Sequence, residues 1–311
     1  MNNRVYGVIG ISSVMANWNA DFSGYPKATA GGEVFGSDKA LKYPMKKMWE
    51  DNGEKVLYIK SIKTDEGKYN PRTLKERYEH IFNEILDKKK NNLDILRKLF
   101  QAVDVKNFGA TFAEAGANFS ITGAVQIGQG FNKYKDSESQ VQNILSPFQD
   151  SKATEKNKNN EEAKNTTLGT KIVSDEAHYF YPFTINPKAY NEFIEMGVTE
   201  GYTEEDYEKF KDAALTSATY FVTNSKVGCE NEFALFIETD GDLYLPNLDK
   251  YIGFTKGGEK NNIHINCAEL LHDVSDRIHK IEIYYNPYTT AVDTEIVDIT
   301  YYNIFTKQVI Q

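Results

Sequence analysis

The sequence predicts an α+β fold of the ferredoxin-like type that carries large insertions. Residues 4–11 ("RVYGVIGI") are apolar on both faces, which is typical of a buried central strand. Helical patterns at 37–52 and 203–225 are each followed by a strand pattern. The core order is strand, helix, strand, insertion, strand, strand, helix, strand, and this order indicates the fold.

The helix at 37–52 ("SDKALKYPMKKMWEDN") is expected to begin at Ser37 or Asp38, because either side chain can cap it. Pro44 inside the pattern predicts a kink or a later start. Helical spacing puts three apolar residues on one face and three lysines on another. The apolar residues are Leu41, Met45 and Met48, and the lysines are Lys39, Lys42 and Lys46.

The next segment predicts one strand and two helices. "KVLYIKSIK" (55–63) reads as a strand. Residues 70–86 predict an amphipathic helix with Asn70 as N-cap, Pro71 in the first turn and Ile85 among its inward side chains. A short helix is expected at 93–100.

The second half is expected to consist mostly of strands around one long helix. Alternating apolar and polar residues at 119–127 ("FSITGAVQI") predict a strand. Thr203 and Asp206 form a capping pattern at the start of the long helix. Further strands are expected at 177–186, 231–240, 279–285 and 295–302.

The chain is expected to form one domain over 1–311, with insertions at 12–36, 64–103 and 146–178 and an extension at 241–311. The first half of 146–178 has almost no apolar residues, as in a disordered linker. It lies between two strong strand patterns and ends in "LGTKIV", so an arm that orders on a partner fits it better.

Composition and charge exclude several classes of protein. With 40% apolar and 26% charged residues, the chain is typical of a soluble globular protein without a membrane span or signal peptide. Cys229 and Cys267 have no metal-binding spacing, which favours a reducing cytoplasm. The net charge of −9 argues against binding nucleic acid over the whole surface. Only five of the 36 basic residues are arginines, so a local groove would hold phosphates rather than read base edges.

The sequence offers no clear catalytic, cofactor or metal site. It holds no Walker loop, complete dinucleotide motif or nucleophile elbow. The turn at 238–244 lacks the closing glutamate of a calcium loop. His178 is better explained as a structural residue than as a general base. Asp21 is a lone loop aspartate, usually a turn or cap residue, with no evident metal partner nearby.

A binding surface remains, made of the loop 12–36, the lysine face and the small-residue stretch 107–130. Small residues let a polyanion approach main-chain N–H groups. They equally let a helix pack closely on a sheet, and the lysines equally form a solvated helix face. The residue pattern alone leaves both explanations open.

Several segments resemble, in order along the chain, the CRISPR-associated Cas7 family of the RAMP superfamily, and within it the subtype I-B branch. These segments are "GVIGISSVMANWN", "GGEVFGSDKALKYPMKK", "DVKNFGATFA", "FSITGAVQIGQGFN" and "HYFYPFTINP". The resemblance covers most of residues 4–240. One departure is that Glu33 and Asp38 lie in a segment that is often more basic in the family.

The resemblance implies an RRM-like palm with an RNA-facing loop at 12–36, a helical finger at 64–103 and a thumb at 146–178. It implies a cytoplasmic subunit without cofactor or catalysis. Several copies would stack along one CRISPR RNA in a type I Cascade complex, together with other Cascade subunits, and leave most bases free to pair with target DNA.

The resemblance also implies which residues contact the RNA. They are Ser12, Asn17, Asn19, Lys27, Ser37, Lys39, Lys42, Lys46, Phe108, Gly109, Thr111, Ser225, Lys226 and Asn231. The tip of the thumb would be formed by Leu168, Lys171, Ile172 and Val173. Two other functions stay open. One is a metal-dependent RNA-cleaving subunit of the type III kind that uses Asp21, and the other is a purely structural oligomer without nucleic acid.

Overall fold

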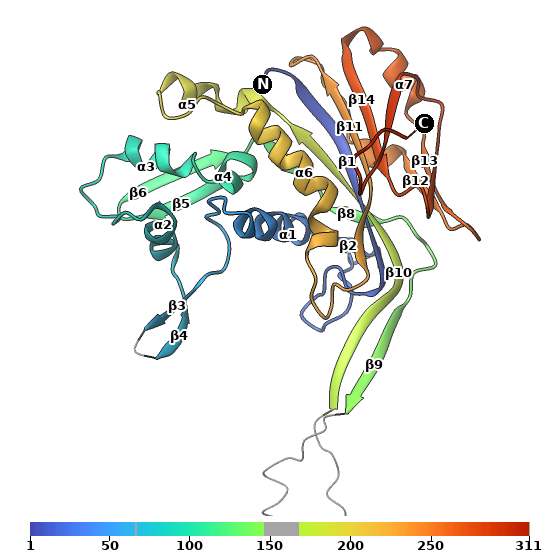
Figure 1. Cartoon of the computed structure of the whole chain (residues 1–311), viewed down its shortest axis with the longest axis horizontal. Coiled ribbons are helices and arrows are strands. Elements are labelled where there is room, and N and C mark those ends of the chain that lie inside the picture. Colours follow the sequence, from blue (N-terminus) through green and yellow to red (C-terminus); the bar gives the residue numbers. More distant parts are fainter. Residues whose placement is uncertain (66, 146–167, 311) are drawn as a thin grey trace, which may run out of the picture.

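A computed structural model describes residues 1–65, 67–145 and 168–310 of the protein. A large central sheet organises the molecule (Figure 1), with the strand order β16–β14–β11–β1–β10–β8–β2. Strands β7 and β9 pair with other stretches of β10. The long strands are β1 (Arg4–Ala16), β10 (Leu168–Ile185), β11 (Cys229–Thr239) and β14 (Ile278–Tyr285). The short strands are β2 (Phe35–Gly36), β7 (Val125–Ile127), β8 (Gly130–Asn132), β9 (Ser139–Leu145) and β16 (Ile299–Asn303).

Strand β1 lies at the centre of this sheet, between β10 and β11, and is antiparallel to both. Val5, Val8 and Ile9 are fully buried, which confirms the predicted central strand. The strand is longer than the predicted 4–11, because its pairing with β10 continues to Ala16 opposite Ser174. The predicted loop at 12–36 therefore begins with strand residues.

Helices α1 (Asp38–Asp51) and α6 (Glu204–Tyr220) lie on the same side of the central sheet (Figure 1). Ser37 caps α1 by accepting a hydrogen bond from the backbone N–H of Ala40, and the helix continues through Pro44 without a later start. The predicted cap of α6 is confirmed, because Thr203 and Asp206 form a reciprocal capping box. The apolar faces of both helices share one hydrophobic core with the sheet.

A second group of elements lies beside α1. It contains α2 (Leu74–Phe82), α3 (Asn92–Leu99), α4 (Val103–Phe108), the hairpin of β3 (Ile62–Asp65) and β4 (Lys68–Pro71), and the hairpin of β5 (Gly109–Glu114) and β6 (Ala117–Thr122). The short helix predicted at 93–100 is confirmed as α3. A further short helix, α5 (Asn191–Glu195), precedes α6.

The predicted strand at 55–63 is wrong over most of its length, since only its last two residues belong to β3. The backbone N–H groups of Leu57 and Tyr58 donate to the buried carboxylate of Asp104, at 2.7 and 2.8 Å. The carbonyl of Val56 accepts from the guanidinium of Arg77. Side chains thus satisfy the backbone groups that a neighbouring strand would otherwise pair.

The helix predicted at 70–86 is shorter at both ends. Its cap is Thr73, in a capping box with Glu76, whereas Asn70 belongs to β4. Ile85 lies beyond the helix end and is 79% exposed, so its predicted inward position is wrong.

The strand predicted at 119–127 is divided at Gly123 into β6 and β7, which belong to different sheets. A Cβ atom on Gly123 would lie 2.2 Å from the carbonyl carbon of Phe108, so the chain can only make this close approach at a glycine. The periodicity of two is correct on either side of the break, because Ile121, Val125 and Ile127 are buried.

The other face of the central sheet is covered by the C-terminal part. A three-stranded sheet of β12 (Ile252–Thr255), β13 (Asn261–Ile265) and β15 (Thr290–Thr294) and the short helix α7 (Ala268–His272) form a second core with Val8, Phe180 and Leu235. The extension 241–311 is not merely packed on the central sheet, since β14 and β16 are strands of it. The strand predicted at 295–302 begins only at Ile299.

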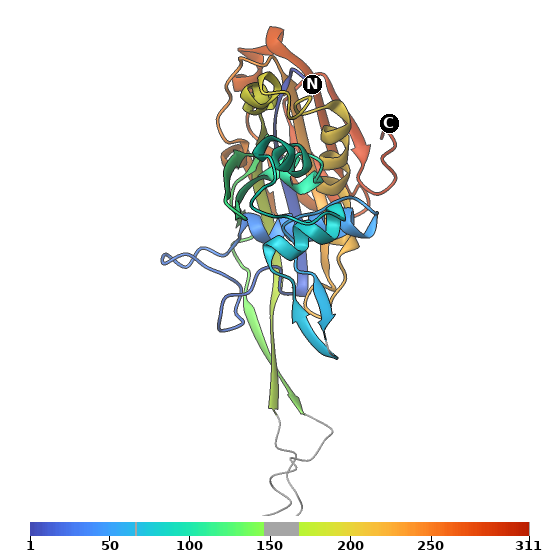
Figure 2. The same cartoon turned by 90° about the vertical axis from the view of Figure 1, so that its left-hand side faces the viewer.

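The hairpins β9–β10 and β3–β4 project from the same end of the molecule (Figures 1 and 2). The base of β9–β10 is fixed to the body, because Val173 is fully buried and the Ile172 carbonyl accepts from the Asn17 amide. Of the residues predicted for the thumb tip, Ile172 and Val173 therefore lie at the base, and all four (Leu168, Lys171, Ile172 and Val173) are strand residues paired with β9. Of the predicted thumb, 168–178 belong to β10 and 146–167 lie outside the described residues. None of the described helices has the length and apolar character needed to cross a membrane.

Candidate nucleic-acid interface

A groove of about 660 Å³ lies between the first turns of α1 and the start of β5. It brings together six of the residues implied to contact RNA. Three come from α1 and three from the segment 108–111, which follows about 70 residues later in the sequence. These six are Lys39, Lys42, Lys46, Phe108, Gly109 and Thr111. The groove is completed by Asp38, Tyr43, Tyr58, Ala110 and Ile121.

The three lysines of the groove differ in how they are held. Lys39 is exposed. The ammonium of Lys42 lies 2.9 Å from the carboxylate of Asp38, one turn earlier in α1. Lys46 donates to the Tyr58 carbonyl at 3.3 Å and lies 3.7 Å from the fully buried carboxylate of Asp104.

Burial lowers the pKa of Lys46, and Asp104 offsets only part of this effect. Its ammonium already contacts the Tyr58 carbonyl and the Asp104 carboxylate. The same carboxylate accepts from the backbone N–H groups of residues 57 and 58. Lys46 is therefore a structural member of the groove, whereas Lys39 is exposed and Lys42 is paired only with Asp38 of its own helix.

The walls of the groove are rigid because its aromatic residues are tied to the body. The centroids of the Phe108 and Trp49 rings are 5.6 Å apart. The ammonium groups of Lys42 and Lys46 lie over the Phe108 ring, 5.1 and 5.9 Å from its centroid. The Tyr58 hydroxyl donates to the Thr111 carbonyl at 2.5 Å, and burial raises the pKa of Tyr58 to about 12.

The small residues of the stretch 107–130 pack against protein backbone. Gly109 has a φ of +80°, and a Cβ atom there would lie 2.2 Å from the Ile121 carbonyl oxygen. At Gly130 a Cβ atom would meet the Tyr181 ring at 2.4 Å. These glycines are required by the packing of the chain on itself, one of the two explanations that the sequence leaves open.

Two of the asparagines in the loop 12–36 fold the loop and are not in the groove. Asn17 is buried, and its amide donates to the carbonyls of Gly24 at 2.9 Å and Ile172 at 3.2 Å. The Asn19 side chain accepts from the backbone N–H of Ser37 at 2.8 Å and so positions the start of α1. Asn19 therefore acts on the groove indirectly, through the path of the chain into α1, whereas Asn17 ties the loop to β10.

The remaining residues implied from this region also lie outside the groove. Ser12 is a half-buried residue of β1, opposite His178 of β10. The Lys27 ammonium lies 5.5 Å from the centre of the Phe35 ring. The Ser37 hydroxyl caps α1.

The segment after α6 holds one predicted contact that the structure contradicts. Asn231 is fully buried, and its side-chain oxygen accepts from the backbone N–H groups of Ala218 and Thr219 while its amide donates to the Ala214 carbonyl. It therefore fastens the end of α6 to β11 and cannot reach a phosphate.

The neighbouring residues differ from it. Lys226 donates to the carbonyls of Asn17 and Trp18, and burial lowers its pKa. Ser225 is exposed.

Asp21 forms a local turn, as lone loop aspartates usually do. Its carboxylate accepts from the backbone N–H groups of Ser23 and Tyr25 at 2.8 and 3.0 Å. Within the described ranges, no three His, Cys, Asp or Glu side chains are grouped so that they would hold a metal ion.

Two groove residues, Tyr43 and Tyr58, are missed by the sequence reasoning. For Tyr43 a signal is present, because it follows Lys39 by four residues and so shares its helix face. For Tyr58 the sequence gives no such signal, because its segment has the residue pattern of a strand.

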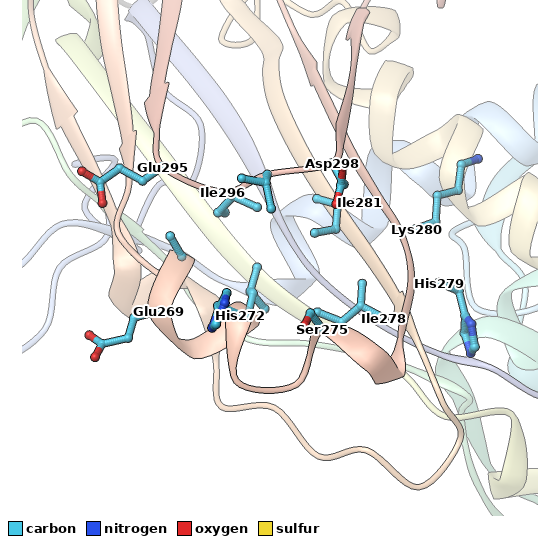
Figure 3. A pocket seen from close by; sticks show the side chains of 13 residues that line it. Glu269, His272, Ser275, Ile278, His279, Lys280, Ile281, Glu295, Ile296 and Asp298 are labelled. Carbon is cyan, nitrogen blue, oxygen red and sulfur yellow. The ribbon is translucent and has the colours of Figure 1, made fainter.

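A second cavity, of about 610 Å³, lies in the C-terminal part between α7, the start of β14 and residues 295–298. Figure 3 shows Glu269 and Glu295 at one end and His279 and Lys280 at the other, with Ile278 and Ile296 between them. None of the residues implied to contact RNA lines this cavity.

Comparison with known proteins places these features in a family. A family model described as CRISPR-associated protein Cas7 matches residues 3–266. A solved structure titled "CRISPR RNA-guided surveillance complex, pre-nicking" is similar at 15% identity and a TM-score of 0.56, covering 96% of each chain. Another, titled "CRISPR RNA-guided surveillance complex", has 13% identity and a TM-score of 0.49, covering 91% of this chain and 88% of the other.

At such identities the first of these structures shows a shared fold. No curated protein sequence matches the chain. The family model, however, spans most of the 311 residues. This chain therefore belongs to the Cas7 family of CRISPR-associated proteins.

Proposed function

We propose that this protein is a CRISPR RNA-binding backbone subunit of a Cascade complex of subtype I-B. The observation that carries the proposal is the groove in which Lys39 and Lys42 of α1 face the start of β5 at Phe108–Thr111. Two lysines above a rigid aromatic and glycine wall suit the phosphates of a single strand. Membership of the Cas7 family supports the choice of CRISPR RNA as the ligand.

In this proposal the strands β11, β1, β10 and β8 with the helices α1 and α6 are the RRM-like palm. Their spatial order, with β1 between β11 and β10 and β8 beyond β10, is that of a ferredoxin-like sheet. The groove lies where the first helix of this palm meets the elements beside it. A strand bound there runs along the body and leaves most of its bases free for pairing with target DNA.

The groove holds phosphates without reading sequence. Binding exchanges the Asp38–Lys42 ion pair for a phosphate–Lys42 pair, which is an exchange between two partly exposed contacts. Lysine offers a point charge without a fork for base edges, so the affinity should be independent of base sequence.

The partners in this proposal are other copies of the chain, other Cascade subunits and target DNA paired to the guide. The hairpin β9–β10 projects from the body (Figure 1), and in this proposal it contacts a neighbouring copy. The subunit itself cuts nothing, and the free thiols of Cys229 and Cys267 suit a cytoplasmic location.

The test is a titration of labelled single-stranded RNA with purified protein at several salt concentrations, read by fluorescence anisotropy. The expected result is binding that weakens with salt and is equal for RNAs of different sequence. The absorbance ratio at 260 and 280 nm of protein purified from its host gives a second readout. A protein that carries no RNA from its host and binds none in the titration is a structural oligomer. A protein that cuts bound RNA with Mg²⁺ or Mn²⁺ is an enzyme.

A further inference from the structure

The groove contains three aromatic rings, and two of them are half-buried and already contact lysine ammonium groups. Phe108 lies against Trp49, and the ammonium groups of Lys42 and Lys46 lie over its ring. Tyr58 is fixed through its hydroxyl to Thr111, and Lys46 lies 5.6 Å from its ring centre. A flat ligand group would compete with these contacts on the ring faces that they occupy.

Tyr43 is different, because its side chain is 43% exposed. Its ring meets Phe221 edge to face, with centroids 5.3 Å apart and an interplanar angle of 74°. This contact fixes the orientation of the ring without covering both of its faces. Among the described aromatic residues that line the groove, Tyr43 is the exposed one, whereas Tyr58 and Phe108 are half-buried.

The position of Tyr43 relative to the lysines matches one nucleotide. Tyr43 follows Lys39 by one helical turn, so their Cβ atoms lie about 5–6 Å apart on one face of α1. Lys42 is the residue before Tyr43 and lines the same groove. A phosphate held between Lys39 and Lys42 would therefore leave its sugar and base beside the Tyr43 ring.

We propose that Tyr43 stacks a nucleobase of the bound RNA, while Lys39 and Lys42 hold the phosphates next to it. This inference rests on the proposed function and extends it, because it makes the groove a site for a whole nucleotide rather than for backbone charge alone. Stacking on an aromatic ring tolerates any base, so it adds affinity without adding sequence preference. Tyr43 is then a binding residue that contacts the RNA directly.

The experiment compares two ligands of equal length on the full chain. One is a 12-nucleotide oligoadenosine RNA, and the other is a 12-unit abasic ribose-phosphate oligomer, each with a 5′ fluorophore. For the RNA, Tyr43→Leu should weaken binding about 5- to 150-fold, which is the effect of losing one base–aromatic stack. For the abasic oligomer, Tyr43→Leu should leave the affinity unchanged.

Two control variants separate stacking from folding. Leucine keeps an apolar contact with Phe221, and an unchanged melting temperature shows that the fold is intact. Tyr43→Phe keeps the ring and should bind RNA like the wild type. Tyr288→Leu removes a 74% exposed tyrosine in the C-terminal part and should bind both ligands like the wild type.

The outcomes distinguish this inference from the function on which it rests. If the wild type binds both ligands and Tyr43→Leu weakens neither, the stacking inference is wrong and the proposed function stands. Equal weakening of both ligands by Tyr43→Leu also overturns the inference, because it shows an effect without a base. A wild-type protein that binds neither ligand overturns the proposed function and this inference with it.

Discussion

The imidazole of His178 is bonded to the carboxylate of Glu232 in the interior, with Nδ1 at 2.8 Å from both carboxylate oxygens. On its other side, Nε2 lies 3.1 Å from Glu176, which also pairs with Lys256. The ring stacks on Phe254 at a centroid distance of 3.8 Å. The cluster joins β10, β11 and the C-terminal part where the hairpin β9–β10 leaves the body.

The stability of the fold should depend on the charge of His178. Burial alone lowers its pKa, but Glu232 and then Glu176 outweigh burial, so the pKa is raised above 6.5. A raised pKa in the folded state adds stability that is fully present below pH 6.5 and is lost as the pH rises through the folded value. The free energy of unfolding, measured with urea from mildly acidic to mildly alkaline pH, should fall over this range.

The variant His178→Gln keeps a donor toward Glu232 but carries no charge. Below the folded pKa it should be less stable than the wild type by ~3–5 kcal/mol, as when one partner of a buried ion pair is removed. Above that pKa the difference in the free energy of unfolding between wild type and variant should become smaller. A gap that is constant over the whole pH range would show that His178 stays neutral.

The salt dependence of RNA binding should identify the lysines that hold phosphates. Each phosphate neutralised on a single strand contributes about 0.7 to the slope of log affinity against log salt concentration. Lys39→Ala with Lys42→Ala should therefore lower the slope by about 1.4. The matched control is Lys46→Ala, which should leave the slope unchanged and lower the melting temperature, because Lys46 pairs with Asp104. An unchanged slope in the double variant would show that the groove is not the phosphate-binding site.

Asn231→Ala should unfold more easily while binding RNA like the wild type. The change removes two buried hydrogen bonds to the N–H groups at the end of α6 and one to the Ala214 carbonyl. Leaving such groups unpaired costs about 1–3 kcal/mol for each, so the loss of stability in urea should be at least ~2 kcal/mol. A stable variant with weaker RNA binding would instead restore Asn231 as an RNA contact.

The hairpin β9–β10 allows two deletions that differ by six residues. Replacing 150–167 with a short Gly-Ser linker should keep the melting temperature and abolish cooperative assembly on a long guide RNA, as seen by native mass spectrometry. Replacing 150–173 also removes Val173 and the Ile172 carbonyl that holds Asn17, so it should destabilise the body. Full-length filaments formed by the shorter deletion would show that residues 150–167 do not join copies.

Cleavage of RNA should be absent with Mg²⁺ or Mn²⁺. The Asp21 carboxylate is used by two backbone N–H groups of its own turn, and nothing in the described residues groups with it as a metal site. The measurement is gel analysis of a labelled RNA complementary to the guide. Cutting that is lost in Asp21→Ala and kept in a distant surface variant would make the protein an enzyme.

The predictable parts of the fold are those in which a local pattern and the packing agree. Strands β1 and β11 were predictable because their apolar runs are buried on both faces, and helix α6 was predictable because its capping pattern forms the capping box that the sequence suggests. The segment 55–61 was not predictable as coil, since its backbone partners, Asp104 and Arg77, are remote in sequence. A hydrogen bond between residues so far apart in the sequence cannot be predicted from a local residue pattern.

The candidate site shows the same division. The lysine face of α1 follows from helical spacing, and the block at 108–111 was found through a resemblance. Their meeting in one groove required the structure. The role of Asn231 could not be read from the sequence either, because a polar side chain next to a helix end caps the helix or faces solvent depending on how α6 meets β11.

The central position of β1 also sets the order in which the chain can fold during synthesis. Its two neighbours are β10 and β11. Val5 can therefore pair only after Ile185 has been synthesised, and Arg4 only after Thr239 has been synthesised. At about 5–20 residues per second, roughly 10–50 s pass between synthesis of the first strand and of its last partner. Throughout that time β1 is an apolar strand without its two neighbours, and it is exposed to aggregation or to chaperones.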